Sequence, residues 1–195
     1  MIESKLIPKA VFTDKSVETV NKLKELVGVK DTASMNQTHS DVIAYVNFPR
    51  IYDSDGIFTE NPKLGLVVQT ADCLPILLSD KKRIGAIHSG WRGLEKNILI
   101  KAIKKFDVNQ LSISIGPHAQ SCCYEIKENV RKYFKDYTEL REGKFFLNMS
   151  QILIDLSEER GFKIEVSTIC TICDSSYNSY RKNKTNKRQF GVIWR

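Results

Sequence analysis

The chain has 195 residues, of which 42% are hydrophobic and 27% are charged, and its formal net charge is +7 at pH 7. This composition is ordinary for a globular domain, and a chain of this length can bury a substantial core. No run of 18 apolar residues occurs, and Met1–Lys15 lacks the apolar centre of a signal peptide. The sequence therefore predicts one cytoplasmic domain over residues 1–195, without a membrane span.

The predicted elements begin with a helix. Ser16–Val27 carries apolar residues at helical spacing and is followed by Gly28, which is typical of an amphipathic helix and its end. Short apolar runs then predict strands, and the polar turn at residues 81–83 predicts a hairpin between the last two. These strands are Asp41–Asn47, Leu64–Gln69, Cys73–Leu78 and Ile84–His88.

Helices and strands are mixed in the second half. Apolar residues from Leu94 to Phe106 lie on one helical face, and Leu111, Ile113 and Ile115 alternate with serines as in a strand. Further helices are predicted at Val130–Tyr137 and around Ile152–Leu156, ending at Gly161, and late strands at Ile164–Ile169 and Phe190–Trp194. Because no βαβ rhythm appears, we expect an α/β (α+β) fold with mixed sheets and helices outside them.

Two of the three histidines and one cysteine stand at predicted strand ends. His39 precedes a strand, Cys73 lies between two apolar runs, and His88 ends a strand before a Gly-rich turn. Side chains at such ends can converge on a pocket. Two imidazoles and a thiolate form a catalytic zinc set with one open position, where a bound water becomes a nucleophile near neutral pH. Asp72 is expected to orient one imidazole.

The same residues permit other interpretations. Isolated His and Cys residues are often satisfied core residues, and Cys73 with His88 can also form a nucleophile and its base without metal. That second interpretation predicts a cysteine hydrolase, such as an amidase acting on a cell-wall peptide precursor. The turn at residues 90–93 can hold an anion with the help of Arg92, or it can simply begin a helix with Trp91 in the core.

The other cysteines give weaker patterns. The odd count of five argues against a complete disulfide framework. Cys170 and Cys173 form a lone C-x-x-C, and Cys122 and Cys123 are adjacent, which is not a zinc-ligand spacing; we expect buried thiols in both places. We expect His118 to be an exposed polar residue. Positive residues near the C-terminus favour a solvated face over a nucleic-acid site: Arg181, Lys182, Lys184, Lys187, Arg188 and Arg195.

Taken together, the motifs resemble the laccase-domain family, also called multicopper polyphenol oxidoreductases. The resemblance covers roughly residues 35–195. It rests on residues 37–42 (QTHSDV), 70–75 (TADCLP), 86–93 (AIHSGWRG), 115–117 (IGP), 123–125 (CYE), 170–171 (CT) and 179–181 (SYR), followed by Thr185, Arg188 and Gln189.

The resemblance implies mixed sheets sandwiched between helical layers, with His39, Cys73 and His88 as ligands of Zn²⁺. It implies a purine nucleoside phosphorylase for adenosine, inosine, guanosine and methylthioadenosine, with phosphate as co-substrate and adenosine deaminase as a second activity. Asp72 is expected to act in catalysis, and Arg92, Arg181 and Gln37 to bind substrate or phosphate. We expect a monomer or homodimer, without nucleic-acid or membrane partners.

The older name of that family predicts a copper-dependent polyphenol oxidase. A multicopper oxidase needs several copper centres and many histidines, whereas this chain has three. A single copper ion can replace zinc at two imidazoles and a thiolate, because copper binds such sites tightly. We therefore interpret copper as a substitute. The zinc deaminases with H-x-E and P-C-x-x-C motifs are excluded, because neither motif is present.

Overall fold

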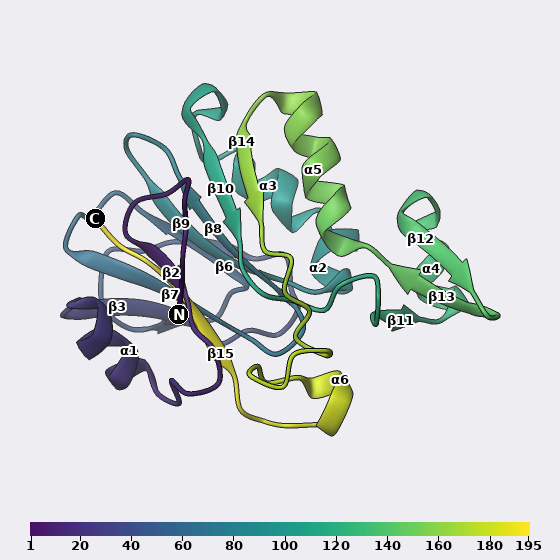
Figure 1. The fold of residues 1–195 in the computed structure, drawn as a ribbon. Helices are drawn as coiled ribbons and strands as arrows, with labels where there is room; N and C mark the ends of the chain where they lie inside the picture. Colours follow the sequence, from purple (N-terminus) through teal and green to yellow (C-terminus); the bar gives the residue numbers. More distant parts are fainter.

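The computed structural model describes residues 1–195, and its strands form three sheets (Figure 1). The first sheet has the order β1 (Ile2–Glu3), β2 (Ala10–Phe12), β15 (Gln189–Ile193), β7 (Leu64–Thr70), β3 (Asp31–Met35) and β5 (Ile51–Tyr52). The second has the order β14 (Lys163–Val166), β10 (Ser112–Ile115), β8 (Leu74–Ser79), β9 (Ile84–Ser89), β6 (Gly56–Thr59) and β4 (Ile43–Tyr45). Both sheets mix parallel and antiparallel neighbours, as the sequence predicts.

A third, smaller sheet extends from the side of the main body (Figure 1). It contains β11 (Glu125–Ile126), β13 (Lys144–Leu147) and β12 (Thr138–Arg141). The helices are α1 (Val20–Val27), α2 (Trp91–Glu95), α3 (Ile98–Ile103), α4 (Glu128–Arg131), α5 (Met149–Arg160) and α6 (Tyr180–Asn183), with 3₁₀ turns at Val108–Gln110 and Lys135–Tyr137. None of these helices has the length and apolar character needed to span a membrane.

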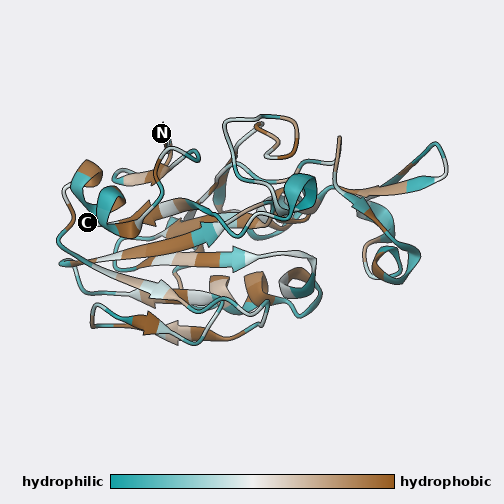
Figure 2. Ribbon diagram, turned by 90° about the horizontal axis from the view of Figure 1, so that it is seen from below, coloured by the Kyte–Doolittle hydropathy of each residue, from teal (hydrophilic) through white to brown (hydrophobic).

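The two large sheets pack face to face, and the alternation of side chains explains why. Along β7, Leu66 and Val68 point into a core shared with Leu77 of β8, whereas Val67 points to the opposite face and packs with Leu23 of α1. Burying a side chain such as Leu23 stabilises the fold by about 2 kcal/mol. In Figure 2, many segments of the strands are coloured brown, which marks hydrophobic residues.

The outer face of the second sheet carries α2, α3 and α5. Ile76 and Leu78 of β8 alternate with Leu77 and pack in a separate core with residues of α3, α5 and β10. The order of layers is therefore helix, sheet, sheet, helix. This arrangement confirms the predicted fold of sheets between helical layers.

Several predicted boundaries are also confirmed, and three helices differ. The β8–β9 hairpin forms in antiparallel register, and α5 ends at Gly161 in a left-handed conformation. The first helix starts at Val20 rather than Ser16, because the Thr19 side chain accepts a hydrogen bond from Lys22 N and caps it.

The helix predicted over Leu94–Phe106 is instead divided into α2 and α3. Asn97 interrupts it with a φ of 62°, a left-handed conformation that ends a right-handed helix. The apolar spacing continues across the break because both short helices cover the same core. The helix predicted over Val130–Tyr137 is likewise reduced to the single turn of α4 and a 3₁₀ turn.

Candidate metal centre and substrate cavity

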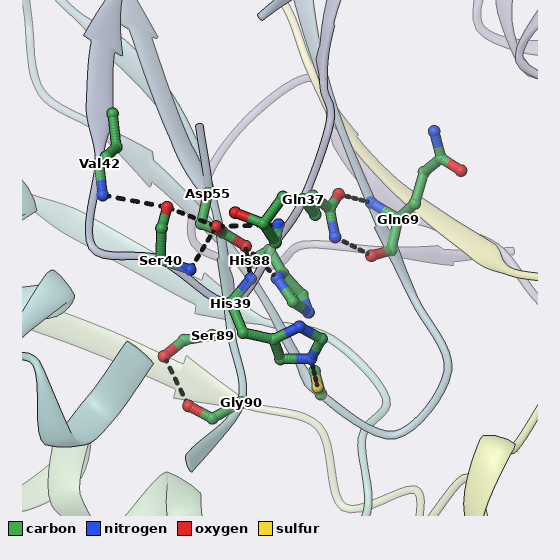
Figure 3. A network of polar contacts seen from close by, with 11 residues as sticks. Gln37, His39, Ser40, Val42, Asp55, Gln69, His88, Ser89 and Gly90 are labelled. Carbon is green, nitrogen blue, oxygen red and sulfur yellow. Dashed lines mark hydrogen bonds and ion pairs between the residues drawn. The ribbon is translucent and has the colours of Figure 1, made fainter. Parts of the chain in front are cut away.

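His39, Cys73 and His88 come together in one cluster, and Figure 3 shows the two imidazoles of His39 and His88 beside each other. His39 lies in the loop before β4, Cys73 in the turn between β7 and β8, and His88 near the end of β9. One potential ligand atom from each residue lies within 4.8 Å of the other two. Cys73 Sγ is 3.7 Å from Nε2 of His39, and the two imidazole centroids are 4.8 Å apart. The three side chains can therefore hold one metal ion.

Asp55 holds two of these residues in place (Figure 3). Its carboxylate lies 2.7 Å from Nδ1 of His88, and it accepts hydrogen bonds from the backbone N–H groups of Thr38, His39 and Ser40. The Ser40 hydroxyl also donates to it. His39 has a φ of 61°, which is unusual for a residue with a side chain, and the N–H donors to Asp55 fix this turn. With Nδ1 engaged, His88 has Nε2 left for a ligand.

The charges at this cluster support one another. Burial alone would raise the pKa of Asp55, but the His88 imidazole and the Ser40 donors hold it well below its usual range. Burial alone would also raise the pKa of Cys73, but His88 and His39 lower it below its ordinary value. Burial opposes the charged form of His88, yet Cys73 and Asp55 raise its pKa. Cys73 therefore has the thiolate character that a metal ligand needs.

Asp72 makes other contacts than the predicted one with an imidazole. Its carboxylate accepts hydrogen bonds from the Thr171 hydroxyl at 2.8 Å and from the backbone N–H of Arg181 at 2.7 Å. The residue that hydrogen-bonds an imidazole is Asp55. Asp72 has a φ of 93° and instead ties the turn before Cys73 to the C-terminal segment. The prediction that Asp72 orients an imidazole is wrong because its carboxylate turns toward these two donors.

Gly90 closes the other side of the cluster. A β-carbon at this position would lie 2.8 Å from Cys73 Sγ and 3.3 Å from Cδ2 of His39. Such contacts are closer than side-chain atoms normally come. Glycine is therefore required here by the space that the two side chains occupy, since its φ of −90° is accessible to any residue.

A cavity of about 530 Å³ opens above the cluster. This volume lies within the usual range for small-molecule sites. Besides the three residues of the cluster, it is lined by Met35, Asn36, Gln37, Gln69, Thr70, Ala71, Asp72, Gly90, Trp91, Arg92, Tyr124, Tyr180, Arg181 and Arg188. Positive guanidinium groups and aromatic rings thus surround the candidate metal ligands.

All the residues that the sequence proposes for substrate binding line this cavity, in different ways. The Gln37 amide pairs with the backbone of Gln69, donating to its carbonyl and accepting from its N–H. Arg92 stacks on Trp91, which also packs against the core. Arg181 lies 4.4 Å from the centroid of the Tyr124 ring. The Arg181 guanidinium also donates a hydrogen bond to the Glu125 carbonyl, and the Gln37 amide is occupied by the Gln69 backbone.

Three functional candidates were missed by the sequence reasoning. Asp55 has no local signal, because an acid in a polar turn before a strand usually predicts an exposed loop. Arg188 lines the cavity, whereas its place in the C-terminal positive cluster predicts a solvated face. Tyr124 is buried, and burial raises its pKa to about 12, so its phenol keeps its proton at neutral pH. Only the motif at residues 123–125 points to a functional role for Tyr124 in the sequence.

His118 and the remaining cysteines also differ from expectation. His118 is fully buried: Nδ1 lies 2.8 Å from the Gly116 carbonyl, and the Gln120 amide lies 3.1 Å from Nε2. Burial lowers its pKa to about 4, which keeps the ring neutral. Of the cysteines predicted to be buried thiols, Cys170 is buried, whereas Cys122 and Cys173 are exposed. These expectations fail because sequence spacing does not reveal which loops pack together.

Comparison with known proteins identifies relatives of this chain. The model of the family described as multi-copper polyphenol oxidoreductase laccase matches residues 13–195. A Clostridium acetobutylicum protein named purine nucleoside phosphorylase is 33% identical over 94% of this chain and 85% of its own length. A Borreliella burgdorferi protein of the same name is 32% identical over 96% and 92%. An Aquifex aeolicus protein of that name is 36% identical over 72% and 70%.

Solved structures show the same fold. YlmD from Geobacillus stearothermophilus has a TM-score of 0.84 and 20% identity, covering 100% of this chain and 98% of that one. The Neisseria meningitidis protein NMB0706 has a TM-score of 0.79 and 26% identity, covering 89% and 78%. With the family model matching almost the whole chain, this protein belongs to the multi-copper polyphenol oxidoreductase laccase family, whose curated relatives are named purine nucleoside phosphorylases.

Proposed function

We propose that residues 1–195 form a single domain that acts as a zinc-dependent purine nucleoside phosphorylase. The observation that carries this proposal is the placement of His39, Cys73 and His88 in a cavity that also presents three arginines. The cavity suits a nucleoside in size, and the names of the relatives supply the reaction type.

The donor set fits zinc. Two imidazole nitrogens and one thiolate are soft or borderline ligands, and three protein ligands are the usual number at a catalytic zinc ion. The Asp55–His88 contact adds the outer hydrogen bond that ligating histidines normally make. Zinc held here would act as a Lewis acid toward a substrate oxygen or nitrogen atom. Copper would bind the same three residues and is a substitute in this proposal.

The arginines would hold the phosphate. Arg92, Arg181 and Arg188 line the same cavity, and guanidinium groups bind phosphate oxygens through paired hydrogen bonds. A phosphate oxygen would attack C1′ of the ribose, the bond from C1′ to the purine nitrogen would break, and the purine would leave with a proton. The protonated phenol of Tyr124 is available to donate a hydrogen bond inside the cavity.

The purine base would meet the aromatic rings. Trp91 and Tyr180 line the cavity and offer faces on which a base can stack. Stacking tolerates different bases, so we propose adenosine, inosine, guanosine and methylthioadenosine as substrates. Hydrolytic removal of the amino group of adenosine is proposed as a second activity of the same site.

A product assay tests this function. The zinc-loaded protein would be incubated with adenosine and phosphate, and the products separated by liquid chromatography. We expect adenine and ribose 1-phosphate, with inosine from the second activity. All products should be lost with a chelator or in the His88→Ala variant and retained in Lys182→Ala, a change on exposed α6 outside the cavity. Absence of product from a zinc-loaded, folded protein would contradict the proposal.

A cysteine hydrolase, expected from the sequence to use Cys73 and His88, is the second candidate. The imidazole contact that favours it is between Cys73 Sγ and Nε2 of His39, at 3.7 Å. The lowered pKa of Cys73 is also what a nucleophilic thiol requires. This enzyme would hydrolyse amide substrates, such as a cell-wall peptide precursor, in the presence of a chelator. Thiol alkylation at Cys73 would abolish that activity. Chelator sensitivity therefore separates the two candidates.

A further inference from the structure

Four cysteines that the proposed reaction does not use meet in one cluster outside the cavity. Sγ of Cys173 lies 3.0 Å from Sγ of Cys123 and 3.7 Å from Sγ of Cys122. Cys170 completes the group, and all four sulfur atoms lie within 4.8 Å of one another. Four thiols rarely gather so closely without a reason, because sulfur atoms gain little from contact with one another.

The distances suit a tetrahedral metal ion. A zinc ion binds thiolates at about 2.3 Å, which places the sulfur atoms of a tetrahedral site about 3.8 Å apart. The observed separations of 3.0 Å, 3.7 Å and up to 4.8 Å lie around this value. A disulfide, with an S–S distance of about 2.05 Å, would join only two of the four sulfurs and leave the other two unexplained.

Two tight turns bring the sulfurs together. Cys122 and Cys123 lie in a turn closed by Cys123 N–H donating to the Gln120 carbonyl, and Cys170 and Cys173 in a turn closed by Asp174 N–H donating to the Cys170 carbonyl. The backbone of His118 links the turns through a bridge to Cys170 and hydrogen bonds to Ile169 and Thr171. The relative position of the turns is thus fixed by the backbone and not by the cysteines alone.

A backbone donor also suits a thiolate at Cys170. Gln120 N–H donates to Cys170 Sγ over 3.5 Å, the kind of contact that stabilises negative charge on sulfur. Cys170 is buried, whereas Cys122 and Cys173 are exposed. A metal ion can therefore reach the cluster from solvent and then be held from the buried side.

We propose that Cys122, Cys123, Cys170 and Cys173 form a second metal site, a structural tetrathiolate site for Zn²⁺. Four thiolates leave no open position, so this site does not bind substrate. The position of this site suggests that it stabilises two segments next to the cavity. Cys123 precedes Tyr124, which lines the cavity, and Cys170 precedes Thr171, which donates to Asp72. A metal ion here would fix both segments beside the cavity.

Metal content tests the proposal independently of any activity. The purified full-length protein, loaded with zinc and desalted, would be measured by native mass spectrometry and by elemental analysis. We expect two zinc ions per chain in the wild type and one in the double variant Cys122→Ser/Cys173→Ser, whose changes are exposed and leave the buried Cys170 in place. Ser175→Ala, an exposed change two residues after Cys173, should keep both ions.

A second readout identifies the ligands. After cobalt is substituted for zinc, the wild type should show intense sulfur-to-cobalt charge-transfer absorption, and the Cys122→Ser/Cys173→Ser variant should lose most of it. The Cys73→Ser variant should retain most of it, because one thiolate contributes at the other cluster. Equal zinc content in the wild type and the double variant would overturn the tetrathiolate site. A wild-type mass showing a disulfide among these cysteines in the zinc-loaded protein would also overturn it.

Discussion

Oδ1 of Asp55 lies 2.7 Å from Nδ1 of His88, and both side chains are almost completely buried. The pairing of β6 with β9 produces this contact, because it places Gly56 opposite Ile87 and so brings the preceding Asp55 beside the following His88. The carboxylate also accepts hydrogen bonds from the backbone N–H groups of the turn that contains His39. One buried acid therefore positions two of the three candidate ligands.

Replacing Asp55 should weaken metal binding without removing a ligand. The Asp55→Asn change removes the negative charge and places an amide N–H₂ group opposite the N–H donors of the His39 turn. We therefore expect zinc affinity to fall about 10- to 100-fold. We also expect a loss of at least about 2 kcal/mol in unfolding free energy, because buried donors lose a charged acceptor. Competition with a chromophoric chelator and denaturant melts measure both effects. Asp53→Asn, two residues away and exposed, should leave zinc affinity unchanged.

Gly90→Ala should disturb the candidate metal centre by crowding. The added methyl group would lie 2.8 Å from Cys73 Sγ, while the backbone conformation at this position accepts alanine. We expect lower zinc affinity and at least about a 10-fold loss of phosphorolysis, since small displacements of reacting groups are costly. Circular dichroism should show an intact fold. Unchanged activity in this variant would mean that Cys73 does not act where we place it.

Arg188→Ala should weaken phosphate binding. Its guanidinium lines the cavity and is anchored by the carbonyls of Thr185 and Lys187. Loss of a charge-assisted contact of about 1.5 to 3 kcal/mol corresponds to an increase of about 10- to 100-fold in KM for phosphate. Steady-state kinetics with varied phosphate measures this increase. Lys187→Ala, which removes an adjacent exposed charge, serves as the control and should leave KM for phosphate near the wild-type value.

Thr171→Val tests the role assigned to Asp72. The change removes the hydroxyl that donates to Asp72 over 2.8 Å in a buried setting and keeps the side-chain shape. We expect a loss of about 1 to 3 kcal/mol in unfolding free energy, because a buried carboxylate loses a donor. Zinc affinity at the His39, Cys73 and His88 cluster should remain unchanged. A large loss of that zinc would show that Asp72 acts on the metal ligands after all.

Glu165 should make the free energy of unfolding change with pH in the acid range. Burial alone would raise the pKa of this carboxyl, but hydrogen bonds from the hydroxyls of Ser114 and Ser4 and the backbone N–H of Lys5 lower it. Because the pKa of Glu165 is lower in the folded state than in the unfolded state, the carboxylate stabilises the fold at pH values above the unfolded-state pKa, which is about 4.3. This stability is lost as pH falls through the folded pKa.

Glu165→Gln should therefore be less stable than the wild type at pH 7. We expect the difference to shrink as the pH falls from the unfolded-state pKa through the lower folded-state pKa, because the carboxyl is protonated first in the unfolded state and then in the folded state. Urea unfolding at a series of pH values measures it. The exposed control Glu158→Gln should follow the wild-type curve at every pH. A constant difference between Glu165→Gln and the wild type would contradict this linkage.

The sequence by itself determined the strands that are continuous apolar runs. Leu64–Thr70, Leu74–Ser79 and Ile84–Ser89 are recognisable because each is a short apolar run bounded by polar turns. The short strands β1, β2, β5 and β6 escaped notice, because two to four residues are too few to show a period. Asn97 divided a helix whose apolar spacing looked continuous, since spacing reports the buried face and not the backbone between its residues.

His39, Cys73 and His88 could be proposed together from the sequence because each stands in a distinctive motif at a strand end. Asp55 could not, because only the pairing of β6 with β9 buries that carboxylate against His88. The four-cysteine cluster likewise depends on two turns about 50 residues apart, whose contact is made by backbone hydrogen bonds around His118. Local sequence determines which segments form strands and turns, whereas long-range strand pairing decides which polar side chains share a site.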